Sequence, residues 1–413
     1  MSRLLLLVAF ALAACGDSGT ATSGTATSDG APRDASGTPT SNVSTETQPS
    51  PDPRASNPGM SADSLALARA RLEDALERYR QLESSGWPTI PDGDLVEVGD
   101  SAAAQVEPLR QRLAAEDALG DAARTGAVYD ARLAASVARF QARHGLAVDS
   151  LLGANTREAL NVSAGERVAQ IERSLAQWED MPEIPTGPGA RYVMVNVPEF
   201  RVRAFEDGRE ALQMEVVVGA EYDDRTTPTF HETMDHVIFR PYWNVPPGIA
   251  TDELVPKGPA QLAEEGFEIV GYYDPDAEVR EMTAANLRRV AAGSLRLRQK
   301  GGEENALGLV KYMFPNQYAV YLHDTPADHL FDEATRAYSH GCIRLERPAE
   351  FGAWVLGPQG WDESRVSQSM NSGERQRVEL EETIPVFVVY LPVWADESGE
   401  VHFSRDIYDR LDS

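Results

Sequence analysis

The sequence is poor in cysteine and in positive charge. Among 413 residues there are only two cysteines, Cys15 and Cys342, so a framework of several disulfides cannot form. The chain has 38 basic residues against 65 acidic ones, which gives a formal net charge of −27. Nucleic-acid binding relies on Lys and Arg to neutralise phosphates, so this balance argues against a nucleic-acid partner. An acidic ligand would need a local basic pocket, because the field of the whole chain repels it.

The N-terminus has the features of a bacterial export signal. Arg3 precedes an apolar run over residues 4–14, which is too short to span a bilayer permanently. The run ends in Leu12-Ala13-Ala14-Cys15, which resembles a lipobox and implies that residues 1–14 are a lipoprotein signal peptide and that Cys15 is acylated. The alternative is an ordinary signal peptide that leaves Cys15 as a bystander. Because Gly16 is not the Asp that retains some lipoproteins in the inner membrane, we expect a periplasmic protein with an outer-membrane lipid anchor.

Cys342 is then the only thiol available for chemistry. If Cys15 carries lipid, Cys342 has no disulfide partner in the chain, although exported proteins occupy compartments in which thiols tend to pair. A single unpaired cysteine there is a candidate for a reactive thiol. His340 and Arg344 flank Cys342 in a polar segment that contains Gly341. Such a segment fits an inert buried cysteine less well than a thiolate nucleophile.

Residues 15–105 comprise a predicted tether followed by a predicted helical scaffold. Residues 15–60 are mainly Ser, Thr, Gly, Pro, Asn and Asp, which cannot bury a core, so we expect a disordered tether. Residues 61–105 are predicted as a helical scaffold, because apolar side chains recur there at helical spacing. These side chains are Leu65, Leu72, Leu76 and Tyr79.

Residues 106–162 predict a compact helical domain with a recognisable motif. Its apolar residues recur three or four positions apart, and a glycine follows the helix that carries Phe140. The run Phe140-Gln141-x2-His144-Gly145-Leu146-x2-Asp149 resembles the small peptidoglycan-binding domain of cell-wall enzymes. Any three-helix bundle would share the apolar spacing, but the Phe140–Asp149 run is not typical of one. The resemblance implies that peptidoglycan is a partner.

The C-terminal half predicts a mostly-β domain. After a linking helix within 163–190, residues 191–396 contain short runs rich in Val, Tyr and Phe, bounded by Gly, Pro and Asp. One of these runs, 318–322, predicts a strand that leads into His323. Residues 246–308 interrupt the series with helical patterns and a basic run, which predicts an inserted lid or else a surface excursion without function. Residues 397–413 are left as a C-terminal tail. We therefore expect an α+β multidomain chain.

Two histidines accompany the thiol. His340 lies two residues before Cys342, and His323 lies nineteen residues before it. In one interpretation Cys342 is a nucleophile, His323 takes its proton and His340 tunes the pocket. In a second, the three residues bind zinc with an open fourth position. In a third, the histidines are structural. The first interpretation needs neither a cofactor nor a metal.

A resemblance to a known family bears on this choice. The runs Tyr321-Leu322-His323-Asp324-Thr325-Pro326 and Ser339-His340-Gly341-Cys342-Ile343-Arg344 resemble the catalytic signature of the L,D-transpeptidases, which have a YkuD-type catalytic domain. The surroundings resemble the large bacterial branch, which has a peptidoglycan-binding domain and a capping insert. Across about residues 61–413, further matching runs are Tyr192–Asn196, Tyr242–Pro247, Asn305–Gly308 and Lys311–Asn316.

The resemblance implies a mechanism on peptidoglycan stem peptides. Cys342 would attack the carbonyl of the third residue of a tetrapeptide donor, release D-Ala and form a thioester. The side-chain amine of a second stem would resolve it into a 3→3 crosslink. His323 would be the general base, and the N–H groups of Gly341 and Cys342 would bind the oxyanion. A monomer suffices for this chemistry, and we expect one.

The resemblance implies roles for further residues. His340 would orient the thiol or assist the oxyanion, and Ser339 would hold the loop. Arg344 would hold the loop or pair with a stem-peptide carboxylate. Tyr321, Trp243 and Asn244 would contact substrate.

Two points stay open at this level. Shorter family members commonly have Gly after the motif histidine, whereas this chain has Asp324, which could orient His323 or merely cap the turn. The acceptor is the other point, because water in place of an amine gives a peptidase that hydrolyses stem peptides or a lipoprotein–wall linkage. A wall-binding protein with an inactive catalytic fold is a third possibility, against which the intact His323 and Ser339–Arg344 segment argue.

Overall fold

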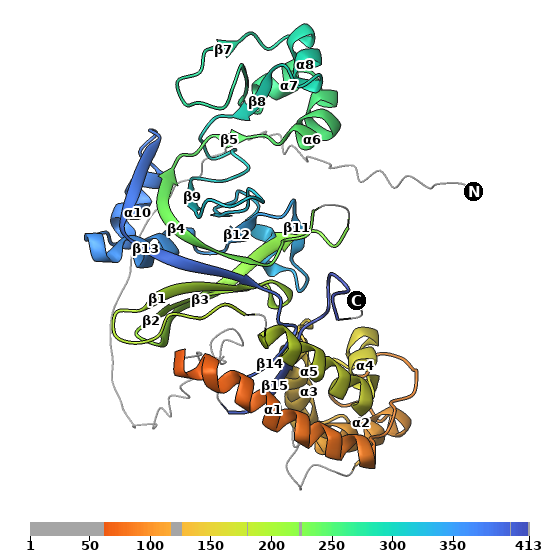
Figure 1. The fold of residues 1–413 in the computed structure, drawn as a ribbon. Coiled ribbons are helices and arrows are strands. Elements are labelled where there is room, and N and C mark those ends of the chain that lie inside the picture. Colours follow the sequence, from red (N-terminus) through yellow and green to blue (C-terminus); the bar gives the residue numbers. More distant parts are fainter. Residues whose placement is uncertain (1–61, 117–125, 180, 223–224, 397, 412–413) are drawn as a thin grey trace, which may run out of the picture. The chain divides into compact units, whose positions relative to one another are not determined.

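The computed structural model describes residues 62–116, 126–179, 181–222, 225–396 and 398–411 (Figure 1). The predictions for the signal peptide, Cys15 and the tether lie outside the described residues. Within those ranges, no helix combines the length and apolar character needed to cross a membrane.

The N-terminal part is helical, as its periodicity predicts. Its helices are α1 (Ala62–Ser85), α2 (Ala103–Ala115), α3 (Ala131–Arg143), α4 (Ala154–Asn161) and α5 (Ala164–Glu179). Asp130 caps α3 by accepting a hydrogen bond from the Leu133 N–H at 2.9 Å. The core of this part consists of buried apolar residues that include Leu109, Leu113, Leu133, Val137 and Phe140.

The polar members of the motif hold this helical domain together. The Gln141 amide donates to Asp149 Oδ1 at 2.7 Å and to Thr156 Oγ1 at 3.0 Å. His144 is buried and stacks on Phe140 with ring centroids 3.7 Å apart. Burial lowers the pKa of His144 well below its usual value, so this imidazole is neutral. Gln141, His144 and Asp149 therefore have structural roles in this domain. The apolar spacing of the helices does not by itself predict these polar residues.

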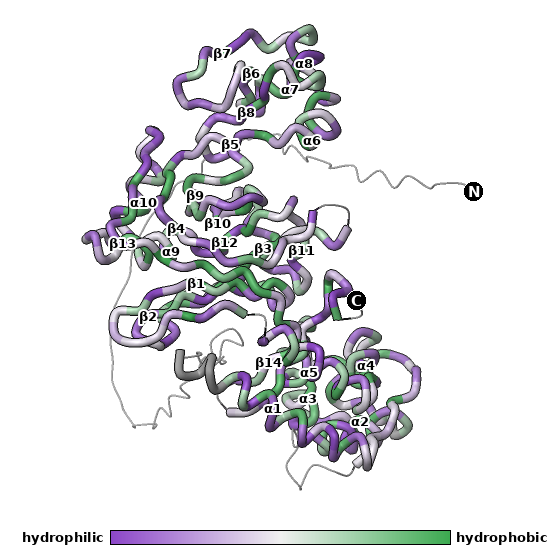
Figure 2. The backbone as a smooth tube through the Cα atoms, viewed as in Figure 1, coloured by the Kyte–Doolittle hydropathy of each residue, from purple (hydrophilic) through white to green (hydrophobic). Residues whose placement is uncertain are grey.

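The C-terminal part is built on a nine-stranded sheet with the order β11-β3-β12-β10-β9-β4-β13-β1-β2. Its strands are β1 (Arg191–Asn196), β2 (Arg201–Glu206), β3 (Arg209–Gly219), β4 (Phe230–Phe239), β9 (Val310–Met313), β10 (Leu322–His323), β11 (Ala337–Ser339), β12 (Ile343–Leu345) and β13 (Gln376–Val389). The long strand β3 pairs with β2 along its first part and with β12 and β11 along its last residues, so the sheet closes on itself. The second half of β3 is buried, and Figure 2 shows hydrophobic stretches within the strands of this sheet. The predicted fold class, helical domain followed by a mostly-β domain, is confirmed.

Two helices cover part of this sheet. They are α9 (Pro348–Leu356) and α10 (Glu363–Met370). Phe351 and Val355 of α9 and Val366 of α10 are buried in the same core as the strands.

The strand prediction over 318–322 is largely wrong. Only Leu322 and His323 form β10, while the preceding residues form a turn. The side chain of Asn316 holds that turn, because its Oδ1 accepts from the N–H groups of Tyr318 at 3.0 Å and Val320 at 3.2 Å. Ala319 has a φ of 55°, which no strand residue adopts. The apolar run favours a β-strand, but here the Asn316 side chain hydrogen-bonds to the nearby backbone and takes the place of strand pairing.

The inserted segment is a packed unit with a sheet of its own. Its strands follow the order β5-β8-β6-β7 and its helices lie against them (Figure 1). The elements are β5 (Trp243–Asn244), α6 (Pro247–Ile249), α7 (Pro259–Glu264), β6 (Phe267–Val270), β7 (Val279–Arg280), α8 (Ala284–Ala291) and β8 (Arg296–Gln299). Leu262, Ile269 and Leu297 are fully buried in its core. The basic run is strand β8, in which Arg298 pairs with Glu268 at 2.9 Å.

The chain ends in a hairpin of β14 (Val393–Ala395) and β15 (Val401–Phe403) that packs on the N-terminal helices. Ser174 of α5 donates to the Val393 carbonyl at 2.6 Å. The segment predicted as a tail therefore contains a strand.

Candidate active site

Strand register brings the predicted catalytic residues together on one face of the large sheet. His323 of β10 pairs with Arg344 of β12 on one side and with Lys311 of β9 on the other. Paired residues point to the same face, and so do residues two positions apart. Tyr321 and Cys342 precede the paired positions by two residues, and the Ile343 N–H donates to the Tyr321 carbonyl at 3.1 Å. Tyr321 lies one residue before β10 and Cys342 one residue before β12, so both adjoin the paired strands.

The thiol of Cys342 is protonated in the resting protein. Its Sγ lies 3.6 Å from the Ala319 carbonyl oxygen, and the residue is partly exposed. Burial of the sulfur raises the pKa of the Cys342 thiol, and the N–H and hydroxyl of Tyr321 with the charge of Lys311 only partly offset this. Cys342 therefore needs a base during the reaction, in contrast to a preformed thiolate.

His323 is held as a neutral imidazole. It is 3% exposed, and its Nδ1 lies 2.5 Å from the Asp324 backbone carbonyl oxygen. A carbonyl only accepts, so Nδ1 carries the hydrogen and Nε2 keeps the lone pair. Burial first, and then the charges of Arg344 and Lys311, lower the pKa of His323 to about 3, against an opposing effect of the Asp324 and Leu307 carbonyls. Nε2 of His323 can accept a proton. The pKa of the resulting imidazolium stays low as long as the charges of Arg344 and Lys311 have no counter-ion.

The Asp324 carboxylate caps the turn. Its Oδ2 accepts from the Leu309 N–H and its Oδ1 from the Thr325 N–H, both at 2.7 Å. A Cβ at Gly308, where φ is 59°, would lie 2.3 Å from the same carboxylate, so the packing requires glycine there. Of the two roles left open by the sequence, the structure supports capping, and the backbone carbonyl of Asp324 orients His323 instead.

Replacing Asp324 by Ala should therefore act on stability. Two part-buried N–H groups lose their acceptor, which should lower the free energy of unfolding by about 1–3 kcal/mol. Urea unfolding measures this change. Asp324→Asn keeps one acceptor oxygen and should be destabilised less. A stable Asp324→Asn protein that loses activity as completely as a His323 variant would show instead that the carboxylate orients the imidazole.

The loop before Cys342 is fixed by its own side chain. Ser339 is 3% exposed, and its Oγ donates to the Cys342 carbonyl at 2.5 Å and accepts from the Gly341 N–H at 3.0 Å. Ser339 thus hydrogen-bonds to both Gly341 and Cys342. The Gly341 N–H, which the resemblance implies as an oxyanion donor, is already engaged. Gly341 has a φ of 108°, in the region that favours glycine.

Other predicted site residues lie in the insert or face it. His340 Nε2 is 2.9 Å from Glu253 Oε1 of the insert. Trp243 and Asn244 form β5, where they pair with β8, and Trp243 packs on Phe267 with centroids 6.0 Å apart. In the described part of the chain, no hydrogen bond or ring contact joins Trp243 or Asn244 to Cys342.

Lys311 is a site residue that the sequence reasoning missed. Its Nζ lies 4.8 Å from the centre of the Tyr321 ring, whose edge meets the His323 ring at a centroid distance of 5.8 Å. Burial lowers the pKa of Lys311 to about 8, against an opposing effect of Cys342. Among the described residues, neither Lys311 nor Arg344 has a carboxylate partner. Two unpaired cations beside a thiol, in an acidic chain, mark a place for an anionic group.

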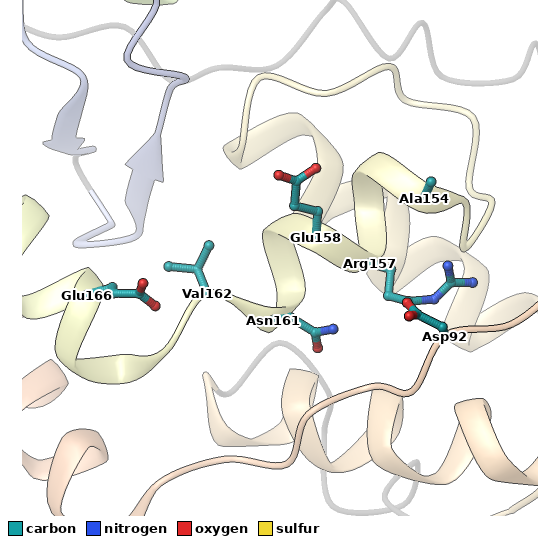
Figure 3. Close-up of a pocket in the computed structure, with 7 residues that line it drawn as sticks. All are labelled: Asp92, Ala154, Arg157, Glu158, Asn161, Val162 and Glu166. Atoms are coloured by element: carbon teal, nitrogen blue, oxygen red, sulfur yellow. The ribbon is translucent and has the colours of Figure 1, made fainter. Parts of the chain in front are cut away.

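No group of three or more His, Cys, Asp or Glu residues is placed to hold a metal ion in the parts of the chain that the structure describes. A polar hollow of about 420 Å³ lies in the helical part, away from this chemistry (Figure 3). It is lined by Asp92, Ala154, Arg157, Glu158, Asn161, Val162 and Glu166. Arg157 donates there to Gln105 Oε1 at 2.9 Å, and Asn161 Nδ2 to the Ile90 carbonyl at 2.9 Å. These side chains fasten α4 to α2 and to the segment that precedes α2.

Comparison with known proteins identifies the two domains. The YkuD family, described as "L,D-transpeptidase catalytic domain", matches residues 190–379. The chain carries a YkuD-family L,D-transpeptidase catalytic domain. A second family, described as "Putative peptidoglycan binding domain", matches residues 103–160. The resemblance drawn from the sequence is confirmed for both the L,D-transpeptidase and the peptidoglycan-binding domain.

One curated relative agrees with this assignment. A protein of Haemophilus influenzae named "Putative L,D-transpeptidase" is 30% identical over 220 residues, which are 52% of this chain and 44% of that protein. The chain thus matches less than half the length of that relative. Among solved structures, L,D-transpeptidase 3 from Mycobacterium tuberculosis shares 14% identity over 49% of this chain and 62% of that one, with a TM-score of 0.24. The L,D-transpeptidase from Stackebrandtia nassauensis shares 12% identity over 73% and 96%, with a TM-score of 0.26. Superposition is poor at these values, so the assignment rests on the two family matches and the curated relative.

Proposed function

We propose that this protein is a cysteine L,D-transpeptidase that forms 3→3 crosslinks between peptidoglycan stem peptides. The observation that carries the proposal is the shared sheet face of Cys342, His323 and two unpaired cations within the matched catalytic domain. The peptidoglycan-binding domain upstream supports the same substrate class.

The first half-reaction makes a thioester. The Cys342 sulfur attacks the carbonyl carbon of the third residue of a tetrapeptide donor while its proton moves to Nε2 of His323. The tetrahedral intermediate then collapses, the bond to D-Ala breaks, and the imidazolium returns the proton to the leaving amine. Because the resting thiol and imidazole are both neutral, the thiol proton has to pass to His323 in the course of this half-reaction.

The two cations give the donor a binding site. A stem-peptide carboxylate that pairs with Arg344 or Lys311 replaces the partner that neither residue has within the described chain. The same pairing cancels positive charge beside His323, and this lets the imidazole take the thiol proton more readily. The Cys342 N–H is the remaining backbone donor for the oxyanion in the loop, since Ser339 engages that of Gly341.

The second half-reaction decides the class of product. The side-chain amine of an acceptor stem attacks the thioester, forms the new amide bond and releases Cys342 as the thiol. Water in its place gives a tripeptide, and the protein would then be a peptidase of stem peptides or of a lipoprotein–wall linkage.

Incubation with purified tetrapeptide-bearing muropeptides, followed by mass analysis, tests the proposal. We expect a 3→3 dimer and free D-Ala, with an acyl-enzyme on Cys342. Tripeptide without dimer would favour the peptidase. Wall binding without any acyl-enzyme would leave a wall-binding protein, and activity abolished by a chelator would favour zinc.

We also propose that the mature protein is lipidated at Cys15 and held in the outer membrane, facing the periplasm. Its support is the lipobox-like run before Cys15 together with the envelope substrate. Intact mass of the protein from membranes should show a diacylglyceryl group, and a Cys15→Ala variant should appear in the soluble fraction. Equal fractionation of both forms would overturn this.

A further inference from the structure

One carboxylate of the insert contacts the catalytic loop at two points. Glu253 Oε1 lies 2.9 Å from Nε2 of His340 and 2.8 Å from a guanidinium nitrogen of Arg225. Glu253 belongs to the helical turn Ala250–Leu254, whose end residues Ala250 and Leu254 are buried in the core of the insert. The turn is therefore anchored in the insert, while its carboxylate reaches out to the large sheet.

Both partners of Glu253 adjoin Gly341, the residue before the thiol. His340 precedes Gly341 in the chain. Arg225 begins a segment packed against Gly341, where an added Cβ would lie 3.6 Å from the Thr226 carbonyl oxygen and 3.8 Å from that of Arg225. A displacement of His340 or Arg225 would therefore displace the backbone that carries Cys342.

Thr227 ties the same segment to the sheet. Its hydroxyl donates to the Gly341 carbonyl at 3.0 Å and accepts from the Gly219 N–H, at the end of β3, at 2.8 Å. A Cβ at Gly219 would lie 2.0 Å from the Arg225 carbonyl oxygen, so the close approach of the two backbones requires glycine at this position. The chain from Arg225 to Thr227 is thus a rigid support behind the loop.

The contact is partly exposed to solvent. The side chains of His340, Glu253 and Arg225 are 34%, 39% and 32% exposed, so each interaction is partly screened by water. One carboxylate shared by two cationic or hydrogen-bonding partners still fixes their separation.

We propose that Glu253 is a positioning residue through which the insert sets the geometry of the Ser339–Cys342 loop. The inference rests on the proposed function and adds that the insert completes the active site by holding His340 and Arg225 on either side of Gly341. His340 then serves as the loop's attachment to the insert.

Glu253→Gln tests the proposal, since it keeps the shape of the side chain and removes its charge. Glu265→Gln is the matched control, because Glu265 is also an insert carboxylate but pairs with Lys257 of the insert at 2.8 Å. Hydrogen exchange of the peptide that contains residues 338–343, kcat and KM for crosslinking, and the rate of iodoacetamide alkylation at Cys342 are measured on the full chain.

We expect faster exchange of that peptide in Glu253→Gln, a kcat lower by about tenfold from misplacement of the thiol, and a KM within about twofold of the parent. Glu265→Gln should match the parent in all three. Exchange that does not change, a kcat that does not fall, or an equal effect of Glu265→Gln would each overturn the proposal.

The readouts also separate this inference from the proposed function. If the parent protein makes no crosslinks, exchange and alkylation still report the loop. A changed alkylation rate in Glu253→Gln alone would then support the positioning role, and identical rates in all three proteins would refute it.

Discussion

Cys342→Ser should lower kcat/KM for crosslinking by at least about a thousandfold, with the fold intact. A serine hydroxyl is a far weaker acid than a thiol, and the pKa of about 3 at His323 leaves little basicity to ionise it. His323→Gln should cost about a hundredfold or more, because the proton then loses the imidazole nitrogen that accepts it. Rates of dimer formation from tetrapeptide muropeptides measure both.

The control for these variants is His231→Gln. His231 is an exposed histidine on β4, in the same sheet but on a different strand, and its variant should keep the parent rate. Thermal unfolding should show that all three variants remain folded. Full activity in Cys342→Ser would rule out the thioester, and full activity in His323→Gln would assign the proton to another group.

Replacing Lys311 should displace the pH dependence of Cys342 alkylation. Lys311→Met removes a cation that favours the thiolate, so the midpoint should rise, by at most about one pH unit because Lys311 itself loses its charge above about pH 8. Below the midpoint, that displacement corresponds to at most roughly tenfold slower alkylation at a given pH. Lys311→Arg should shift the midpoint the other way, because a guanidinium stays charged above the pKa of about 8 of the lysine. Iodoacetamide labelling of the Cys342 peptide from pH 6 to 10, followed by mass, measures the midpoint.

The order of the three midpoints separates an electrostatic role from a packing role. If Lys311 acts through its charge, the alkylation midpoint should be lowest in Lys311→Arg, intermediate in the parent and highest in Lys311→Met. If Lys311 serves only to fill space over the Tyr321 ring, both substitutions should move the midpoint in the same direction or leave it in place. That result would contradict the role assigned to Lys311.

Local sequence was sufficient where short-range chemistry determines structure. The helical domain follows from 3.6-residue periodicity, and residues such as Leu133 and Val137 are buried as that pattern requires. The insert was visible as an interruption, but its sheet was not, because β5 and β7 have two residues each and depend on distant partners. Strand pairing of such short segments is a tertiary contact, which local propensity does not encode.

The sequence alone determined that Cys342 is the solitary thiol of the domain, that His323 accompanies it, and that residues 106–162 resemble a peptidoglycan-binding domain. The first two conclusions need only residue identity and spacing, whereas the third rests on the resemblance of a motif. Tertiary structure decided which groups surround the thiol. The register of β9, β10 and β12 places Lys311 and Arg344 on either side of His323. The insert brings Glu253 to His340 across a sequence separation of 87 residues. The sequence leaves the role of Asp324 open, and in the structure its carboxylate oxygens accept hydrogen bonds from the Leu309 and Thr325 N–H groups. A charge or a hydrogen bond acts through distance in space, and distance between far-separated segments is set only when the strands pair.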